Sequence, residues 1–451
     1  MTHNAEMDDY GLCVFVGPVR VAILRLDPAT QEFSLEYTAE WARSRRGFAL
    51  SPHLPLSGGA SSASIRRFIE NLLPEGRALD VASVHSNIQK NNIFGLIRQL
   101  GRETAGALSF LPANQTPQTL APALRAVSAA ELQERIDSRN EVPFTVWDGK
   151  VRMSVAGFQD KLLVLMDGQK IYLAEGSLAS THILKPEPLN SATPHMVANE
   201  HFCMRLTSRL SLRRFGQDHV AAVDIIRVPS PVLSVTRFDR KGDASGVERR
   251  HVVDGCQALD MPVSAKYERN MGNGKDVQHI RDGVGFEALM STRQYLVQPA
   301  VGVRKLLVWA ITTLLLGNSD AHGKNISFYC TRAGLNVAEL YDLVSVVQYD
   351  TQQYEHDLAM AFGDVFDLSE IGGFALADFC KRTGTSRTYF ARELTTLCKI
   401  AIDEAPLQAA DPVYREEEVP LVQKIAAFVT ERANALLAMA PIIPKFRNDF
   451  F

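Results

Sequence analysis

The chain has 451 residues, of which 46% are hydrophobic and 22% are charged, and its formal net charge is −3. This composition is typical of an ordinary globular protein, and the length predicts two or three domains at a prior of roughly 150 residues each. The nearly balanced charge excludes a general electrostatic attraction to nucleic acid or to an anionic membrane. Any contact with DNA is therefore expected to be local or through a partner.

The N-terminal residues MTHNAEMDDYG are acidic and lack the basic start and the apolar core of a signal peptide. The longest apolar stretch, around residues 306–316, is shorter than the span of a bilayer. We therefore expect a cytoplasmic protein with no membrane partner. The six cysteines form no Cys-x-x-Cys pair, which predicts reduced, buried thiols instead of a disulfide framework or structural zinc.

The order of patterns along the chain predicts an α+β protein. Residues 14–38 alternate like β-strands, and a helical pattern follows from Ser64 towards Leu100. The stretch NQTPQTLAPAL at 114–124 is rich in Pro and Thr and is typical of a linker. A strand-rich region then runs to about Arg240, and periodic apolar residues predict mainly helices beyond it. Three domains are expected, at residues 1–125, 126–240 and 241–451.

Residues 151–185 predict a strand, a small-residue turn, a second strand, another turn and a last short strand that ends in Lys185. In the first turn, the small residues Ala156 and Gly157 would let backbone N–H groups approach phosphate oxygens closely. Lys185 would then pair with the α and β phosphates of a nucleotide. Each signal has a structural alternative, because a lone lysine more often keeps its charge in water at the protein surface.

A polar loop, GNSDAHGKN at 317–325, separates an apolar helix-like run from a strand-like run. Asp320 and Asn325 stand five apart, which is the spacing by which kinases hold a catalytic carboxylate beside a metal-binding amide. Asp342 follows after the strand-like run and a turn, and would add a second oxygen ligand for Mg²⁺ against a triphosphate. The alternative is an ordinary polar turn, but loops between rigid elements commonly carry catalytic residues.

Two further motifs are rejected as sites. The segment GNGKD at 272–276 looks phosphate-binding, but Asp276 stands where a Walker motif needs Ser or Thr, so we expect a mobile loop. Arg43, Arg45 and Arg46 form a basic cluster that could contact DNA phosphates or a partner protein. A solvated turn is the expected role of this cluster, because arginine is readily exposed.

The chain resembles the HipA-type bacterial serine/threonine kinases in motifs that occur in the same order: FIENLLPEGR, GRETAGALSFLP, SVAGFQDK, THILK, ANEHFCMRL, RFDR, CQALDMPVSAKYE, GNSDAHGKN and YDLVS. The resemblance spans nearly the whole chain. It implies a protein-kinase-like two-lobed fold with an extra N-terminal α+β subdomain and a mainly helical C-terminal lobe.

The resemblance also implies a role for each motif position. Asp320 would be the catalytic base, and Asn325 and Asp342 would bind Mg²⁺. Glu200, in a helix-like segment, is a candidate partner for Lys185, with a solvent-facing charge as the alternative. The residues that would hold ATP, with Thr236 to Phe238 as the adenine hinge, are Ala156, Gly157, Phe158, Gln159, Asp160, Lys161, Lys185, Thr236, Arg237, Phe238, His322, Gly323, Lys324 and Asn325.

Ser154 matches the loop serine that such kinases autophosphorylate. A phosphate there would add roughly −1.5 to −2 charges beside a phosphate site, so repulsion would expel the loop and inactivate the enzyme. The chain departs from the best-known family pattern at Phe158 and Asp160, where that pattern has a small residue and Glu. It also has no His-Arg-Asp or Asp-Phe-Gly motif, so regulation through an activation loop of the eukaryotic type is not implied.

The leading hypothesis is a kinase that transfers the γ-phosphate of ATP to a Ser or Thr of a bacterial protein. The resemblance suggests an aminoacyl-tRNA synthetase or another translation component as the target, with growth arrest and persistence as the outcome. It also suggests a HipB-like helix-turn-helix antitoxin as the partner, through which DNA is contacted indirectly. The alternatives are a small-molecule phosphotransferase and a protein that acts chiefly as an antitoxin-bound transcriptional co-repressor.

Overall fold

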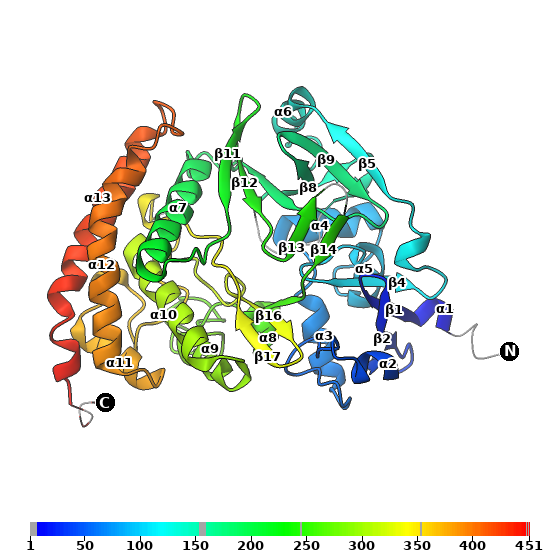
Figure 1. Cartoon of the computed structure of the whole chain (residues 1–451), viewed down its shortest axis with the longest axis horizontal. Coiled ribbons are helices and arrows are strands. Elements are labelled where there is room, and N and C mark those ends of the chain that lie inside the picture. Colours follow the sequence, from blue (N-terminus) through cyan, green and yellow to red (C-terminus); the bar gives the residue numbers. More distant parts are fainter. Residues whose placement is uncertain (1–6, 153–158, 244–245, 352–353, 448, 450) are drawn as a thin grey trace. The chain divides into compact units, whose positions relative to one another are not determined.

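The computed structural model describes residues 7–451 apart from 153–158, 244–245, 352–353, 448 and 450 (Figure 1). Helices and sheets are both present, so the expected α+β class is confirmed. The chain forms two compact units. The first unit contains Met1–Pro186, Ile226–Val263 and Phe328–Asn336, and the second contains Glu187–Ile225, Ser264–Ser327 and Val337–Phe451. Because both units are discontinuous in sequence, the division into three consecutive domains stays a prediction.

The first unit begins with a four-stranded antiparallel sheet in the order β3-β2-β1-β4. Ser61 caps the helix α3 by accepting a hydrogen bond from the backbone N–H of Ser64, and this helix buries Ile65, Phe68 and Ile69. The predicted strands and helices of this region are confirmed. Their bounds are α1 Met7–Tyr10, β1 Gly11–Val16, β2 Val19–Leu26, β3 Phe33–Tyr37, α2 Ala39–Arg43, α3 Ser62–Glu70, α4 Gly76–Ser86, α5 Ile93–Leu100 and β4 Leu108–Pro112.

A second sheet has six strands in the order β11-β12-β10-β8-β9-β5. The stretch at 114–124 is not wholly a linker, because Ala123 and Leu124 begin β5 and pair with β9 in an antiparallel register. The residues of β5 alternate only weakly between apolar and polar. We infer that pairing with β9, and not its own sequence pattern, stabilises this strand. The elements here are β5 Ala123–Val127, α6 Ala129–Asp137, β6 Val146–Trp147, β7 Lys150–Val151, β8 Leu162–Asp167, β9 Lys170–Glu175, β10 His182–Pro186, β11 Val223–Arg227 and β12 Pro231–Thr236.

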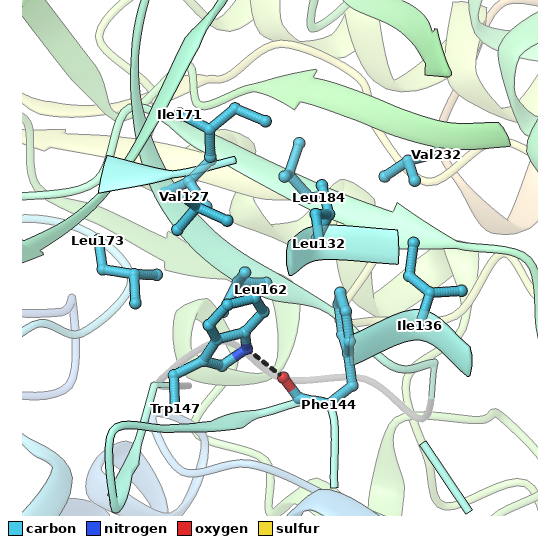
Figure 2. Packing of buried hydrophobic residues seen from close by; sticks show 11 residues of the cluster. Val127, Leu132, Ile136, Phe144, Trp147, Leu162, Ile171, Leu173, Leu184 and Val232 are labelled. Atoms are coloured by element: carbon cyan, nitrogen blue, oxygen red, sulfur yellow. Dashed lines mark hydrogen bonds between the residues drawn. The ribbon is translucent and has the colours of Figure 1, made fainter. Parts of the chain in front are cut away.

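A buried apolar cluster lies between this sheet and α6 (Figure 2). Leu132 and Ile136 of α6 meet Leu162 and Leu184 of the sheet, and all four are buried. Trp147 adds a large ring and donates its indole N–H to the backbone oxygen of Phe144 at 2.7 Å, so its polar atom is satisfied inside the core. Full burial of one such side chain contributes about 1.5–3 kcal/mol, which fixes the strands that carry the nucleotide-site candidates.

Strands continue beyond Arg240, so the expectation that the chain turns mainly helical there is wrong for the next stretch. The residues on either side of 244–245 form two paired antiparallel strands, β13 Arg240–Asp243 and β14 Gly246–Arg249. A three-stranded sheet follows in the order β15-β16-β17. Its bounds are β15 Val252–Asp254, β16 Ser327–Thr331 and β17 Gly334–Val337, and the short helix α8 covers Gly255–Ala258.

The second unit is mainly helical, as the periodic apolar residues predict. Helices α12 and α13 run side by side (Figure 1). Phe286, Phe362 and Phe379 pack together in the core with ring centroids 4.9–5.4 Å apart. The helices are α7 Met196–Phe215, α9 Phe286–Ser291, α10 Pro299–Leu316, α11 Gly373–Arg382, α12 Arg387–Ala409 and α13 Val419–Met439.

Two helical segments of the described chain are long and apolar enough to cross a membrane by length and composition alone, Pro299–Leu316 and Val419–Lys445. The prediction that the apolar stretch near 306–316 is too short is therefore wrong in length, because its helix already begins at Pro299. Of this apolar window 67% is buried, as in the core helix of a soluble protein. All six cysteines are buried and none is in a disulfide, so the prediction of reduced, buried thiols is confirmed.

Candidate active site

The polar loop predicted to be catalytic lies between α10 and β16 in the second unit. Gly317 ends α10 in the left-handed conformation, with φ at 62°, and a side chain there would collide with Val347 and Phe428. The chain then forms the loop 318–326 and enters β16 at Ser327. The predicted order of buried helix, polar loop and strand is confirmed.

Hydrogen bonds inside the loop hold its backbone in one arrangement. The backbone oxygen of Asp320 accepts from the N–H of His322 at 2.8 Å and from the side-chain Nδ2 of Asn325 at 2.8 Å. The N–H of Asn325 donates to the oxygen of His322 at 2.9 Å. This hydrogen bond uses Nδ2 of Asn325, and the other polar atom of the same side chain, the amide oxygen Oδ1, is of a type that suits Mg²⁺.

Neighbouring segments brace the loop from outside. Gly323 donates its N–H to the backbone oxygen of Lys266 at 2.9 Å, and a Cβ at this glycine would approach Val284 to 2.9 Å. Ser319 accepts from the N–H of Ala359 at 3.0 Å. The side chains of His322 and Lys324 are buried. The loop is therefore closely packed, and the glycine at 323 is required by space.

The structure adds Tyr267, which the sequence did not single out. Its hydroxyl donates to Oδ1 of Asp320 at 2.6 Å, and its ring meets the ring of His322 edge to face with centroids 5.0 Å apart. Tyr267 lies in the motif CQALDMPVSAKYE, to which the sequence assigns no chemical role. A single sequence carries no signal for this contact, because the two residues are far apart along the chain.

Asp342, the second candidate metal ligand, has a left-handed backbone, with φ at 57°. This conformation is unfavourable for a residue with a Cβ, and such strain is concentrated at functional sites. The adjacent Tyr341 donates its hydroxyl to the backbone oxygen of Lys324 at 2.6 Å. The segment that carries Asp342 is therefore joined directly to the loop that carries Asp320 and Asn325.

The donor set of this unit fits Mg²⁺ held together with phosphates. Among the residues that the structure describes, no group of three or more His, Cys, Asp or Glu side chains is arranged to hold a metal ion. Asn325 and Asp342 supply one amide oxygen and one carboxylate. Mg²⁺ commonly takes one or two carboxylates and keeps waters and substrate phosphates as its other ligands, so a sparse oxygen set is chemically suitable.

The expected nucleotide-binding residues lie in the first unit. Lys185 sits on β10 opposite Leu233 of β12, and it is 6% exposed, so the surface alternative is wrong. Lys161 is also buried, and Gln159 donates to the backbone oxygen of Pro186 at 3.4 Å, while Asp160 is half-buried. The other candidates of this loop, Ser154, Ala156, Gly157 and Phe158, lie outside the residues that the structure describes.

The expected adenine hinge, Thr236 to Phe238, begins at the last residue of β12. The backbone N–H of Arg237 donates to Thr181 at 2.9 Å, and the backbone oxygen of Phe238 accepts from the hydroxyl of Tyr329 at 2.9 Å. Thr236 is exposed and its hydroxyl is 3.2 Å from Nε2 of His182. The hinge assignment stays a prediction.

The side chain of Arg237 points into a buried charge cluster. It forms a two-pronged contact with Asp239, at 3.0 and 2.8 Å, and donates to the hydroxyl of Ser180 at 2.9 Å. Arg240 donates to the same Asp239 oxygen at 2.7 Å, and Glu103 from the N-terminal part of the unit lies 3.5 Å from Arg237. The guanidinium of Arg237 is therefore bonded within this cluster and does not face solvent at the expected hinge.

The cluster strongly favours its charged form. Burial alone would raise the pKa of Asp239, but Arg237 and Arg240 outweigh it and hold that pKa well below its ordinary value. Burial would likewise raise the pKa of Glu103, but Arg237 and Arg240 outweigh it, so the pKa of Glu103 is also lowered. The backbone N–H of Gly106 donates to Asp239 at 2.7 Å, and Gly106 has φ at 76°. The cluster thus joins the 103–106 segment to the hinge segment.

Glu200 lies on α7 and is 1% exposed, so the alternative of a solvent-facing charge is wrong. Its pairing with Lys185 stays a prediction. Arg43, Arg45 and Arg46 are exposed, as expected for a solvated turn. The GNGKD segment at 272–276 is also exposed and does not lie between a strand and a helix as a phosphate loop would.

Comparisons with known proteins cover nearly the whole chain. Residues 12–111 match the HipA N-terminal domain, and residues 153–405 match the HipA-like C-terminal domain. The chain is 40% identical over 427 residues to the serine/threonine-protein kinase toxin HipA of Shewanella oneidensis, covering 94% of this chain and 93% of that protein. A solved structure of Shewanella oneidensis HipA with HipB and its operator DNA matches with a TM-score of 0.86 and 38% identity, covering 97% of this chain and 100% of that one.

Proposed function

The chain belongs to the HipA family of serine/threonine protein kinases, and on this premise we propose that it transfers the γ-phosphoryl group of ATP to a Ser or Thr of a bacterial protein. The observation that carries this proposal is the arrangement of Asp320, Asn325 and Asp342 in the second unit. The loop hydrogen bonds and the strained backbone of Asp342 support it as a phosphoryl-transfer site.

In the proposed reaction, the acceptor hydroxyl oxygen forms a bond to the γ-phosphorus. The bond from that phosphorus to the bridging oxygen breaks, and ADP leaves with the electron pair. Asp320 orients the hydroxyl and takes its proton. Phosphoryl transfer needs mainly positioning and charge stabilisation, which is why a rigid loop suits it.

Mg²⁺, when bound, would neutralise charge on the β and γ phosphates. Asn325 and Asp342 would hold it through their side-chain oxygens. Lys185 would pair with the phosphates of the nucleotide, and the segment from Ala156 to Lys161 would cover them. We include phosphorylation of Ser154 in the proposal, where the added charge would repel the nucleotide phosphates and stop the reaction.

The proposal includes a HipB-like antitoxin as partner and an aminoacyl-tRNA synthetase or another translation component as target, with growth arrest in the cytoplasm as the outcome. The antitoxin is supported by the similar Shewanella oneidensis structure, which contains HipA, HipB and operator DNA. That same complex favours a second candidate function, which is co-repression of transcription through the antitoxin. Co-repression would not require catalysis.

The test is a labelling experiment with γ-labelled ATP, Mg²⁺ and bacterial lysate, with mass spectrometry of the labelled proteins. The wild type should label a discrete protein at Ser or Thr, and Asp320→Ala and Asp342→Ala should not. Label on a small molecule instead would favour a small-molecule phosphotransferase. Absence of any transfer, together with operator binding by the Asp320→Ala protein and its antitoxin, would favour the co-repressor function.

A further inference from the structure

The carboxylate of Asp320 is contacted by a residue from a separate segment of the second unit. Tyr267 donates its hydroxyl to Oδ1 of Asp320 at 2.6 Å. This is a short hydrogen bond to an acid whose orientation matters for the proposed reaction. Tyr267 is half-buried, and its ring is held edge to face against His322 with centroids 5.0 Å apart.

The neighbours of Tyr267 make the segment 265–268 a rigid support. The backbone oxygen of Lys266 accepts from Gly323 at 2.9 Å, inside the catalytic loop. On the other side of Tyr267, Glu268 donates its N–H to Ala359 at 3.0 Å, and Ala359 in turn donates to Ser319 at 3.0 Å. The segment thus contacts the loop directly through Lys266. It contacts the loop a second time through Glu268, by way of Ala359.

The Glu268 side chain strengthens this support. Its Oε2 accepts from the N–H of Ala361 at 2.8 Å, and its Oε1 pairs with Arg281. Val284 and Gly283 donate their N–H groups to Ala265 and Glu268 at 2.8 and 3.1 Å. The backbone on both sides of Tyr267 is therefore fixed, and so is the position of its hydroxyl.

We propose that Tyr267 is a positioning residue for the phosphoryl-transfer reaction: its hydroxyl fixes the rotation of the Asp320 carboxylate and so sets the direction from which the acceptor hydroxyl is received. The inference rests on the proposed role of Asp320 as the base. Tyr267 acts through Asp320 and contacts neither phosphate nor acceptor in this account. The hydroxyl fixes the position of Oδ1 of Asp320, and small misplacements at a reacting centre are costly to the rate.

The test is Tyr267→Phe, which removes the hydroxyl and keeps the ring against His322. We expect kcat for transfer from γ-labelled ATP to fall by roughly 10- to 100-fold, while the KM for ATP stays within about twofold, because only the orientation of the base is lost. A defect that is merely structural would not separate the two constants in this way. The matched control is Tyr414→Phe in the same unit, which removes a buried hydroxyl that contacts His201 and Gln408, and which should leave both constants unchanged.

The inference would be overturned by three results together. The wild type transfers phosphate, Asp320→Asn is inactive, and Tyr267→Phe keeps the wild-type kcat. A wild type without transfer would instead count against the proposed function itself. If Tyr267→Phe does not fold, meta-tyrosine at position 267 keeps the ring and a hydroxyl but moves that hydroxyl away from Oδ1 of Asp320. A lower kcat at constant KM would then support the inference, because the orienting hydrogen bond is lost, and an unchanged kcat would overturn it.

Discussion

The expected hinge segment of the first unit and the proposed catalytic loop of the second unit both carry motif residues, but the two regions use their charged side chains differently. At the expected hinge, the side chains of Arg237, Asp239 and Arg240 form ion pairs with one another in a buried charge cluster. In the loop, backbone groups of Gly323 and Ser319 and the uncharged amide of Asn325 make the bracing contacts. The comparison teaches that a motif residue can serve by holding its backbone in place or by presenting its side chain, and spacing alone does not distinguish these roles.

The largest expected effect comes from Asp320→Asn. The amide keeps an oxygen that can accept from Tyr267, but it cannot take the acceptor proton, so the transfer rate should fall by about 10²- to 10⁴-fold. Stability should change little. Labelled-ATP assays and denaturant unfolding of the same samples give both numbers. A large loss of stability would show that the two regions do not differ as argued.

The same substitution in the hinge cluster, Asp239→Asn, should act mainly on stability. It leaves Arg237 and Arg240 buried without their shared carboxylate, which should cost about 3–5 kcal/mol of unfolding free energy. Denaturant unfolding measures this loss. Glu36→Gln is the control, since Glu36 pairs with Arg25 while its side chain is 69% exposed, and it should cost at most about 1 kcal/mol. Equal losses for the two variants would contradict the prediction.

Asn325→Ala tests whether a side chain of the loop binds Mg²⁺. Removing the amide oxygen should raise the Mg²⁺ concentration for half-maximal rate by at least about tenfold, because metal sites with few protein ligands are sensitive to each contact. A Mg²⁺ titration of the transfer rate tests this. Asn434→Ala on α13 is the matched control, since its side chain also donates to a backbone oxygen, of Thr430, at an exposed site. An unchanged Mg²⁺ dependence would remove Asn325 from the metal site.

The smallest expected effect is the acid response of the hinge cluster. Asp239 and Glu103 have lowered pKa values in the folded protein, from ordinary values of 3.8 and 4.5. Their stabilising contribution is therefore complete above about pH 4.5 and is lost as the pH falls through the lowered folded values. Unfolding midpoints between pH 7 and pH 3 measure it. Glu103→Gln should show a smaller loss over this range, and an identical profile would exclude Glu103 as a contributor.

The sequence by itself determined the family, the α+β class and the candidate loop, because these depend on local signals. Apolar periodicity predicts α10, and polar residues bounded by Gly317 and a strand-like run predict the loop. The spacing of Asp320 and Asn325 is readable from the chain for the same reason. The linker expected at 114–124 is wrong for its last two residues, since they belong to β5, which is stabilised by pairing with β9 and not by its own pattern.

Only the tertiary structure decided which partners these residues have. Burial of Lys185 and Glu200, which sequence left open, depends on the elements that pack over them. The contacts of Arg237 with Glu103 and of Tyr267 with Asp320 join segments far apart in sequence. Such contacts arise from packing, which brings together residues that no local propensity relates, and they decide whether a motif side chain holds the fold or performs the chemistry.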